Sequence, residues 1–421
     1  MPILILAYYI QTLSPFIWQW GHSDFGIRWY GTAYLTGFIM AYFILKKLIK
    51  DHQLHLPPAK LPDFVLFVAI FGVVIGGRLG EAALYRPGMF TTFTHHFPYW
   101  SLLMVQDGGM SAHGGIIGVF VATFIFARRH KCSFLNLIDA GAMVAPIGIG
   151  FGRLANFING ELYGHVWHSR LAVQFPTELI YQSQPLDARI RYLAGKIRTV
   201  HPHLAQFMDH NPVAGMVTFL TRHLQAHHPN LVPALTQHPQ AEIVRLTHTG
   251  KYPFLQHQLQ QVPDFLRQIQ LNVNVRHLWQ TLHPNFHGPL PFTARLQIIT
   301  LARQGNAMVI NHLRHILEPR IPSQLIEAFF EGLVLFLICW FIGRNWRKAG
   351  MASGAFAVFY PIMRIIGEQF RQGDQPKLIF GHWISLGVLY SVPMLIVGLI
   401  YWIYLIRRPV TPPAAPLTAA R

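Results

Sequence analysis

The stretch GIGFGRLANFINGELYG, residues 148–164, determines how the rest of the chain is interpreted. It begins as an apolar helix and then places Arg153, Asn156, Asn159 and Glu161 within nine residues. An ionisable side chain near a membrane core is costly unless it faces a polar cavity or a ligand. The pattern therefore predicts an apolar helix that ends in a functional site, with Arg153 as the first candidate residue.

The composition is typical of a membrane protein. Of the 421 residues, 52% are hydrophobic and only 12% are charged, whereas a soluble domain carries about 25% charged residues. Apolar runs of about 20 residues recur, which is the length that crosses a bilayer as a helix. The formal net charge is +17. Because the Lys and Arg residues flank the apolar runs, they indicate membrane orientation and anionic lipid rather than nucleic acid.

Seven apolar runs predict an all-α integral membrane protein with seven transmembrane helices. The expected spans are 29–45, 64–85, 109–127, 135–157, 325–342, 352–370 and 384–406. The second carries Gly72, Gly76 and Gly80, and glycines at this spacing let two helices approach closely. Arg78 lies among these glycines. It is either an arginine that extends from the end of a span to the membrane surface or a residue of the site.

The basic residues of the short connections predict the orientation. Most lie on one side of the membrane: Lys46, Lys47, Lys50, Lys60, Arg128, Arg129, Lys131, Arg344, Arg347, Lys348, Arg407 and Arg408. The other side holds little beyond Arg86, Arg371 and Lys377. The positive-inside rule therefore places the N-terminus outside, in the periplasm, and the C-terminus in the cytoplasm.

Five segments follow from this topology. Residues 1–27 form an arm on the membrane with Trp18 and Trp20 at interface depth. Residues 28–165 hold four transmembrane helices and 319–408 hold three, while 409–421 form a disordered cytoplasmic tail. The His-rich insertion 166–318 forms a periplasmic head of short helices or is partly disordered; 263–280 and 294–317 are amphipathic. Its histidines lack a recognisable ligand spacing, so we predict no metal site.

The segment DGGMSAHGG, 107–115, is the first of three candidate site motifs. It opens the third span on the outer side. Small residues flank His113, so a substrate could reach the imidazole ring. A purely structural histidine is the alternative, and the nearby helix N–H groups also suit an anion.

The opening stretch is the second motif. Arg153 and Asn156 are three residues apart and share a helix face, and Asn159-Gly160 predicts the end of the helix. A guanidinium together with amides and the Glu161 carboxylate suits a phosphodiester and its glycerol hydroxyls. The alternative is a polar clamp between two helices.

The third motif lies in the sixth span. Tyr360, Arg364, Glu368 and Arg371 fall within one stripe of about 80° on a helix. An internal ion pair between Arg364 and Glu368 is the alternative to a site. Two arginine-bearing helices at the outer leaflet indicate an anionic lipid headgroup, and a histidine or tyrosine nearby could move a proton. The residues thus predict transfer chemistry on a phospholipid.

Several motifs together resemble one known family. They are RWYGTAYLTGF (28–38), GGRLG (76–80), DGGMSAHGG (107–115), GRLANFINGELYG (152–164), PSQLIE (322–327) and the stripe from Tyr360 to Arg371. On these residues the chain resembles the prolipoprotein diacylglyceryl transferases of the bacterial inner membrane. The resemblance covers 28–165 and 319–408, and the region between is longer than the family's usual outer-face segment.

The resemblance implies a seven-span fold and a transferase reaction. The diacylglyceryl group of phosphatidylglycerol moves to the lipobox cysteine thiol in the signal peptide of a preprolipoprotein, and glycerol 1-phosphate leaves. The family's essential arginines fall on Arg153 and Arg364. Its other site positions fall on Tyr30, His113, Asn156, Glu161, Gly164, Tyr360, Glu368 and Arg371. No cofactor or metal is implied, and we expect a monomer in contact with membrane lipid.

The implied roles fit the chemistry of these side chains. Arg153 and Arg364 would hold the phosphate and stabilise the charge that develops as it departs. Either His113 or Tyr360 would assist deprotonation of the thiol, because the thiolate is the nucleophile. The sequence does not choose between the two.

The chain departs from the family pattern at three positions. Ile321 and Ile326 replace a usual His and Tyr, and Val388 stands where Gln is usual. Each change removes a hydrogen-bonding group near the expected site. They leave open a non-catalytic paralog that binds lipid or lipoprotein. A transporter or channel is a second alternative, although the two halves of the chain show no internal repeat of the kind common in transporters.

Overall fold

The computed structural model describes residues 8–20, 26–95, 98–104, 109–181, 263–284, 286, 292–345, 348–372, 377–379 and 382–408. The chain forms two compact units. The smaller comprises Met1–Leu13 and Val166–Arg320, and the larger comprises Ser14–His165 and Ile321–Arg421. Most of the expected head, 182–262, and the expected tail, 409–421, lie outside the described residues.

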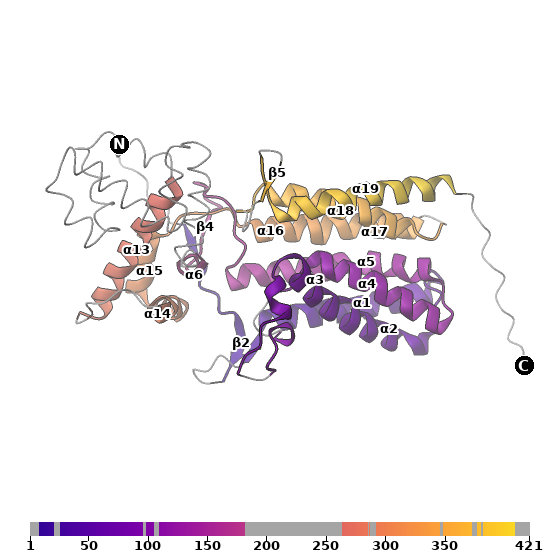
Figure 1. The fold of residues 1–421 in the computed structure, drawn as a ribbon, viewed down its shortest axis with the longest axis horizontal. Helices are drawn as coiled ribbons and strands as arrows, with labels where there is room; N and C mark the ends of the chain where they lie inside the picture. The colour runs from indigo at the N-terminus through magenta and orange to yellow at the C-terminus, as the bar shows by residue number, and fades with distance from the viewer. Residues whose placement is uncertain are drawn as a thin grey trace, which may run out of the picture. The chain divides into compact units, whose positions relative to one another are not determined.

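Helices make up most of the larger unit (Figure 1). Its first half contains α1 (Trp29–Lys50), the continuous run of η1 (Pro58–Lys60), α2 (Leu61–Phe67), η2 (Val68–Ile75) and α3 (Gly76–Leu84), then η3 (Pro87–Phe90), η4 (Ser101–Leu103), α4 (Ala112–His130) and α5 (Phe134–Asn159). Its second half contains the run of α16 (Ser323–Glu327), η8 (Ala328–Val334) and α17 (Leu335–Asn345), then α18 (Met351–Glu368) and α19 (Leu386–Arg407). Two hairpins complete it, β2 (Phe16–Gln19) with β3 (Gly26–Arg28), and β5 (Lys377–Ile379) with β6 (His382–Ile384).

Among the described residues, six helices are long and apolar enough to cross a membrane. They are Trp29–Lys50, Pro58–Leu84, Ala112–His130, Phe134–Asn159, Ser323–Asn345 and Gly387–Arg407. The sequence predicts seven, and the sixth of these, α18, is not among the six. It has 18 residues and buries many of them, including Tyr360 and Arg364. A helix that is surrounded by other helices needs fewer apolar side chains than one that faces lipid. The chain is a multi-pass membrane protein by these six helices.

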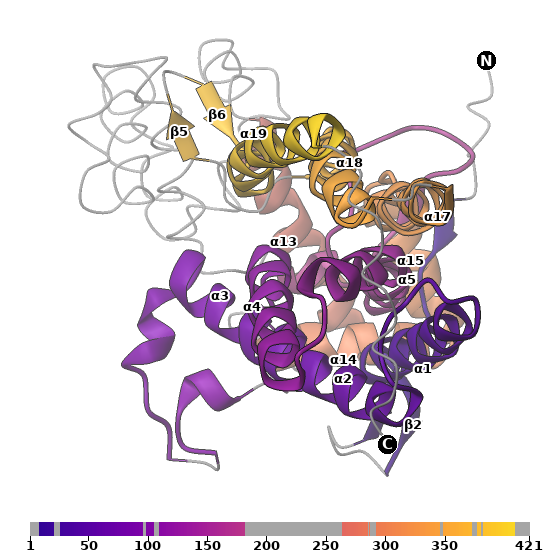
Figure 2. The ribbon, with the colours of Figure 1, turned by 90° about the vertical axis from the view of Figure 1, so that its right-hand side faces the viewer.

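The helix α5 lies in the middle of the larger unit, where it packs against α1, α4, η8, α17 and α18 (Figure 2). Beside it, the run through η2 and α3 packs on α4 through glycines. A Cβ atom placed on Gly80 would lie 2.3 Å from Cα of Gly114, and one on Gly76 would lie 2.7 Å from Cα of Gly118. The close approach expected from the glycine spacing is therefore confirmed.

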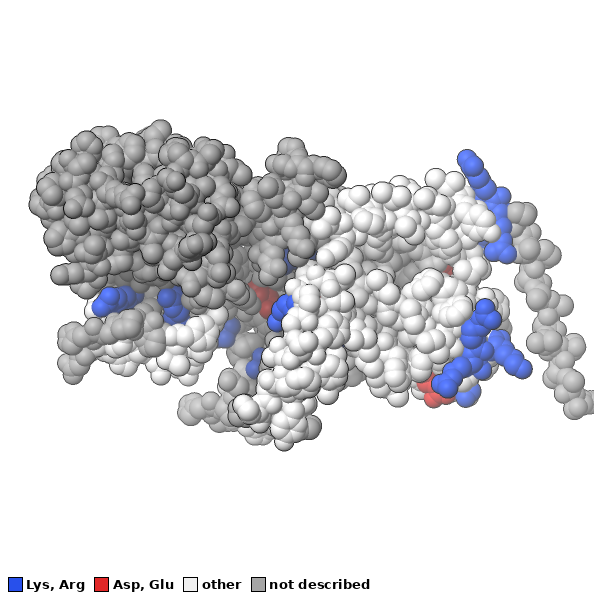
Figure 3. Space-filling model, in the orientation of Figure 1, with Lys and Arg blue, Asp and Glu red and all other residues white. Residues whose placement is uncertain are grey.

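The basic helix ends meet at one face of the larger unit. The Arg344 guanidinium at the end of α17 lies 2.6 Å from the Asp51 carboxylate just after α1, and this hydrogen bond lowers the pKa of Asp51. Asp139 near the start of α5 accepts hydrogen bonds from the backbone N–H groups of Gly350 (2.6 Å) and Ser353 (2.8 Å). Figure 3 shows Lys and Arg gathered at this end of the helices, with few charged residues along their length.

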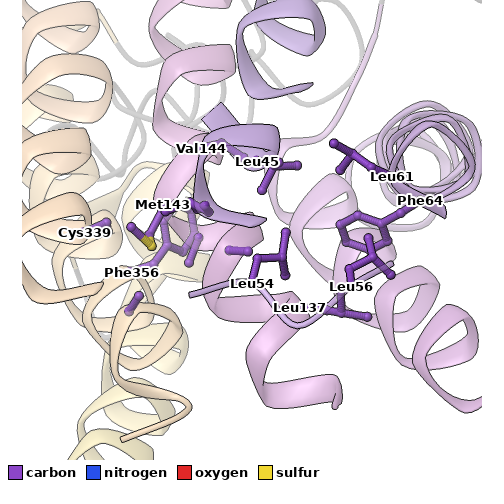
Figure 4. Packing of buried hydrophobic residues seen from close by; sticks show 14 of the residues in the cluster. Leu45, Leu54, Leu56, Leu61, Phe64, Leu137, Met143, Val144, Cys339 and Phe356 are labelled. Carbon is purple, nitrogen blue, oxygen red and sulfur yellow. The ribbon is translucent and has the colours of Figure 1, made fainter. Parts of the chain in front are cut away.

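A hydrophobic cluster lies beneath the basic face. It joins side chains of α1, α2, α5, α17 and α18 with the loop after α1 (Figure 4), among them Leu45, Leu54, Leu61, Phe64, Leu137, Met143, Cys339 and Phe356. Burial of this apolar surface fixes one end of the helix bundle. The polar residues of the site lie toward the opposite ends of α5 and α18.

The smaller unit has its own hydrophobic core. The unit contains α6 (Glu178–Tyr181), α13 (Pro263–Leu282), α14 (Phe292–Arg303), α15 (Ala307–Ile316) and the parallel strands β1 (Tyr9–Ile10) and β4 (Val173–Gln174). Its core includes Ile10, Val275, Ile298 and Leu313. The helix expected over 294–317 is divided in two because Gly305 adopts a left-handed φ of +82°. The described part of 166–318 thus contains short helices around a core.

Candidate active site

Two arginines from different helices converge on the same pair of carboxylates. Arg153, near the end of α5, places its Nη1 atom 3.0 Å from Glu327 and its Nη2 atom 2.9 Å from Glu331. Arg364 of α18 places Nη1 3.1 Å from Glu327 and 3.3 Å from Glu331. Each carboxylate uses one oxygen for each arginine. The four side chains form one bridged cluster, which we call the arginine–glutamate lattice.

The arginine–glutamate lattice is almost closed to solvent. The side chains of Glu327 and Glu331 are 0% exposed, and those of Arg153 and Arg364 are 11% and 9% exposed. Buried charges persist when they are paired and hydrogen-bonded, as they are here. Two positive charges can therefore lie side by side inside an apolar helix bundle because two negative charges alternate with them.

The stripe predicted from Tyr360 to Arg371 extends the lattice, but α18 ends at Glu368. Arg371 therefore lies beyond the helix, and the prediction of one helical stripe is wrong for that residue. Glu368 binds Arg364 through an ion pair, and its Oε1 atom lies 3.5 Å from Nη1 of Arg371. The internal ion pair that the sequence offers as an alternative to a site is thus present, but Arg364 also reaches the carboxylates of another helix. Tyr360 is fully buried and stacks on Phe356 with 5.3 Å between ring centroids. Its hydroxyl has no hydrogen-bond partner among the described residues.

Two glycines let α5 approach η8 beside the lattice. A Cβ atom on Gly332 would lie 2.7 Å from Cα of Gly150, and one on Gly150 would lie 3.0 Å from Cα of Gly332. Gly150 lies less than one turn before Arg153 on α5, and Gly332 directly follows Glu331. This backbone contact therefore sets the separation of the helices at the height where their charged side chains meet.

We expect Gly332→Ala to destabilise the protein by about 1–3 kcal/mol, because the added methyl group forces α5 and η8 apart. Gly141→Ala is the matched control on α5, since nothing lies within 4 Å of a Cβ atom at that position. Thermal unfolding of purified protein in detergent measures the difference. Equal unfolding temperatures for the two variants would contradict the proposed role of the contact.

Three further candidate residues lie together at the end of α5. The Asn156 amide donates hydrogen bonds to the Tyr30 hydroxyl (3.2 Å) and to Oε1 of Glu161 (2.6 Å). The helix ends at Gly160 in the left-handed conformation with φ of 70°, as the Asn-Gly pair predicts. The chain reversal brings Glu161 back to Asn156, so one amide aligns a phenol and a carboxylate.

Gly164 lies where three backbone segments meet. Its N–H donates to the Ile321 carbonyl at 2.8 Å, and a Cβ atom would lie 2.3 Å from the Phe370 carbonyl oxygen. Arg371 pairs with Gly164 as an antiparallel bridge. Glycine is required here because of the close packing. Ile321 contributes backbone atoms to this junction, so these hydrogen bonds do not depend on the His-to-Ile departure at that position.

His113 lies in the first turn of α4. Ser111 caps this helix by accepting a hydrogen bond from the Gly114 N–H at 3.1 Å. The His113 ring meets Tyr390 of α19 edge-on, with 5.4 Å between centroids, and only 8% of the residue is exposed. Neither ring nitrogen has a hydrogen-bond partner in the described part of the chain. Asp107 and Gly108 of the same motif lie outside the described residues.

Comparison with known proteins agrees with this geometry. The family model described as prolipoprotein diacylglyceryl transferase matches residues 15–232 and 274–404. The chain belongs to the prolipoprotein diacylglyceryl transferase family. It is similar to the phosphatidylglycerol–prolipoprotein diacylglyceryl transferases of Bdellovibrio bacteriovorus (32% identity over 90% of this chain and 89% of that protein) and Rickettsia canadensis (38% over 92% and 94%). A third such relative, from Rickettsia bellii, is 29% identical over 94% and 95%.

The comparison widens the range of residues over which the chain resembles the prolipoprotein diacylglyceryl transferases. The sequence limits the resemblance to 28–165 and 319–408 and treats the region between as a long addition. The family model instead continues to residue 232 and resumes at 274, and the relatives align over nearly their whole length. The resemblance therefore extends beyond the expected bounds, and within 166–318 the residues without a match in the family model are 233–273. The interpretation of 166–318 as an inserted head stays a prediction.

Arg78 has a structural role in this member of the family. It is 5% exposed, so it does not extend to the surface. Its guanidinium donates to the carbonyl oxygens of Ser101 (2.7 Å), Leu102 (2.9 Å), Met104 (2.8 Å) and Gly109 (3.0 Å). These bonds hold the backbone of η4 and that of Gly109, two residues before the Ser111 cap of α4, so Arg78 supports the start of the helix that carries His113.

Sequence reasoning missed two residues of the transferase's candidate site, Glu327 and Glu331. The signal is visible in the sequence, because two acids four residues apart in an apolar run share one helix face. Acidic side chains in a membrane span are costly without partners. That signal points to partner cations on another helix, which are Arg153 and Arg364 here. Among the described residues, no three His, Cys, Asp or Glu side chains are grouped so as to hold a metal ion.

Proposed function

We propose that this chain transfers the diacylglyceryl group of phosphatidylglycerol to the lipobox cysteine of a preprolipoprotein. The cysteine thiol loses its proton, and the thiolate attacks the carbon of the diacylglyceryl unit that is esterified to the phosphate. A carbon–sulfur bond forms, the carbon–oxygen bond breaks, and glycerol 1-phosphate leaves with the electron pair. The products are a thioether-linked lipoprotein precursor and glycerol 1-phosphate.

The observation that carries this proposal is the convergence of Arg153 and Arg364 in an apolar helix bundle. Their guanidinium groups lie on the same two carboxylates, so they are close enough to contact one phosphate together. Paired guanidinium forks bind phosphate oxygens with defined geometry. They would also stabilise the negative charge that develops on the leaving phosphate.

The remaining site residues receive roles by position. Tyr30, Asn156 and Glu161 form one hydrogen-bonded group, which suits the hydroxyls of the glycerol headgroup. Glu368 holds Arg364 from its own helix, and Arg371 in turn pairs with Glu368. Gly164 keeps the segment after α5 close to α18. Ile321, Ile326 and Val388, where the chain departs from the family pattern, take no side-chain part in these contacts.

We assign the general base to His113 rather than Tyr360. An imidazole with an ordinary pKa near about 6.5 is neutral and can accept a proton at pH 7, whereas a phenol with a pKa near about 10 is a donor. The two ring nitrogens of His113 have no partner among the described residues. Tyr360 instead lies one turn before Arg364 on α18, and its hydroxyl is a candidate donor to a phosphate oxygen bound by that arginine.

We expect His113→Gln to lower kcat by about 10²–10⁴, the usual contribution of a general base. The acidic limb of the pH–rate profile should disappear with it, because the group that must be deprotonated is gone. Tyr360→Phe is the comparison: it should slow the reaction and keep that limb. A His113→Gln enzyme with native rate and native pH profile would assign the base elsewhere.

We further propose that α18 crosses the membrane as a seventh span. Its start joins the basic face and its end joins the site, which supports a full crossing. The positive-inside rule then puts the basic face in the cytoplasm, the site and the head in the periplasm, and the N-terminus outside. The membrane is the bacterial inner membrane, and the chain acts as a monomer.

The direct test uses purified protein, phosphatidylglycerol vesicles and a peptide with a lipobox cysteine. The proposal expects glycerol 1-phosphate to be released in proportion to peptide that gains the mass of diacylglycerol. A Cys→Ser peptide controls for lipid hydrolysis. Binding of lipid and peptide without release of glycerol phosphate would favour a non-catalytic paralog.

A further inference from the structure

The charges of the lattice balance one another. Every guanidinium nitrogen of Arg153 faces a carboxylate oxygen, with Nε and Nη2 at 3.1 and 2.9 Å from Glu331 and Nη1 at 3.0 Å from Glu327. Arg364 meets three carboxylates, including that of Glu368. Arg371 compensates Glu368 in turn. The lattice together with Glu368 and Arg371 is therefore a neutral assembly of donors and acceptors rather than a cationic pocket.

A neutral assembly treats two kinds of phosphate differently. A phosphodiester carries one negative charge, while a phosphomonoester carries close to two at pH 7. Hydrogen bonds from the guanidinium groups are available to both. The second negative charge of a bound phosphomonoester, however, would lie next to the buried carboxylates of Glu327 and Glu331. A low local dielectric strengthens the repulsion between these like charges.

We propose that the Glu327–Glu331 pair makes the site selective for a phosphodiester monoanion over a phosphomonoester dianion. This rests on the proposed function, in which the substrate is a diester and the leaving group is a monoester. The pair then favours entry of phosphatidylglycerol and departure of glycerol 1-phosphate. Repulsion of the wrong ligand determines specificity here as much as attraction of the right one.

The pair is suited to this because it is fixed in place. Both carboxylates are 0% exposed and each bridges two arginines, so neither can turn away from an incoming charge. Gly367 of α18 leaves room for Glu327, since a Cβ atom there would lie 3.1 Å from its Cγ atom. The carboxylates therefore act on the bound phosphate at constant distance.

The test compares two soluble probes that share one headgroup: glycerophosphoglycerol, a monoanionic diester, and glycerol 1-phosphate, a dianionic monoester. Calorimetry on the full-length protein in detergent measures the dissociation constant of each. We expect the native protein to bind the diester more tightly. Glu331→Gln keeps an oxygen acceptor for the arginines. The variant should shift the ratio of the two dissociation constants toward tighter binding of the monoester by about tenfold, or about 1.4 kcal/mol.

Glu81→Gln is the matched control, because Glu81 pairs with Arg86 outside the lattice, and its ratio should stay native. Glu327→Gln gives a second reading if Glu331→Gln does not fold. Tighter binding of the monoester than of the diester by the native protein would overturn the proposal, as would equal gains for both probes in the variant. These ratios need no turnover, so an enzyme that fails to release glycerol phosphate would refute the proposed function separately.

Discussion

Replacing Arg153 by alanine is expected to lower the rate of diacylglyceryl transfer by about 10²–10³, the usual loss when one donor to a developing negative charge is removed. The loss should appear mainly in kcat, because Arg364 still holds the ground-state phosphate. Purified protein, phosphatidylglycerol and a lipobox peptide measure it directly. Arg153→Lys should recover little activity, since an ammonium cannot span two carboxylates and a phosphate as a planar fork does.

Arg86→Ala is the control for this experiment. Arg86 is about half exposed and pairs with Glu81 outside the lattice, so its removal should leave the rate close to that of the native protein. An Arg153→Ala protein that folds and turns over like the native one would show that the arginine only clamps α5 to η8. That was the structural alternative for this motif.

Replacing Glu327 by alanine is expected to cost about 3–5 kcal/mol of stability, because it leaves two buried arginines short of a counter-ion. The side chain is 0% exposed and lies 3.0 Å from Arg153 and 3.1 Å from Arg364. Unfolding of purified protein in mixed micelles measures the change. Glu81→Ala, which removes a partly exposed carboxylate, should cost less than about 1 kcal/mol.

The double variant Arg153→Ala/Glu327→Ala separates stability from activity. It removes one charge of each sign. Because the two side chains interact, the double variant should lose about 0.5–3 kcal/mol less stability than the sum of the two single variants. Activity should remain as low as in Arg153→Ala, because the phosphate contact is still missing. Additive losses of stability in the double variant would mean that the two side chains act independently.

Six of the seven predicted spans correspond to helices that are long and apolar enough to cross a membrane, because apolar runs and their basic ends are local signals. The end of α5 at Gly160 was predicted from the Asn159-Gly160 pair. The glycine spacing predicted a close helix approach, although not that Gly114 would be the partner of Gly80. The grouping of Arg153 with Asn156 and of Arg364 with Glu368 also follows from helix periodicity. The roles assigned to these residues in binding and catalysis stay predictions.

The partners across helices could not be predicted in the same way. Glu327 and Glu331 are local neighbours of each other, but nothing in their spacing identifies Arg153, which is far away along the chain, as their partner. The structure brings these residues together through the packing of Gly150 on Gly332. The break at Gly305 in the smaller unit depends on its backbone conformation, which hydrophobic periodicity does not report. The apolar run likewise predicted α18 as a span but did not indicate that α5, α17 and α19 would pack around it.

The most direct test of the account is a structure of the native protein with phosphatidylglycerol bound and no acceptor peptide. We predict that oxygens of one lipid phosphate lie within about 3 Å of guanidinium nitrogens from both Arg153 and Arg364. We also predict that the headgroup glycerol reaches toward Asn156 and Glu161. A phosphate bound by only one of these arginines, or by neither, would contradict the account.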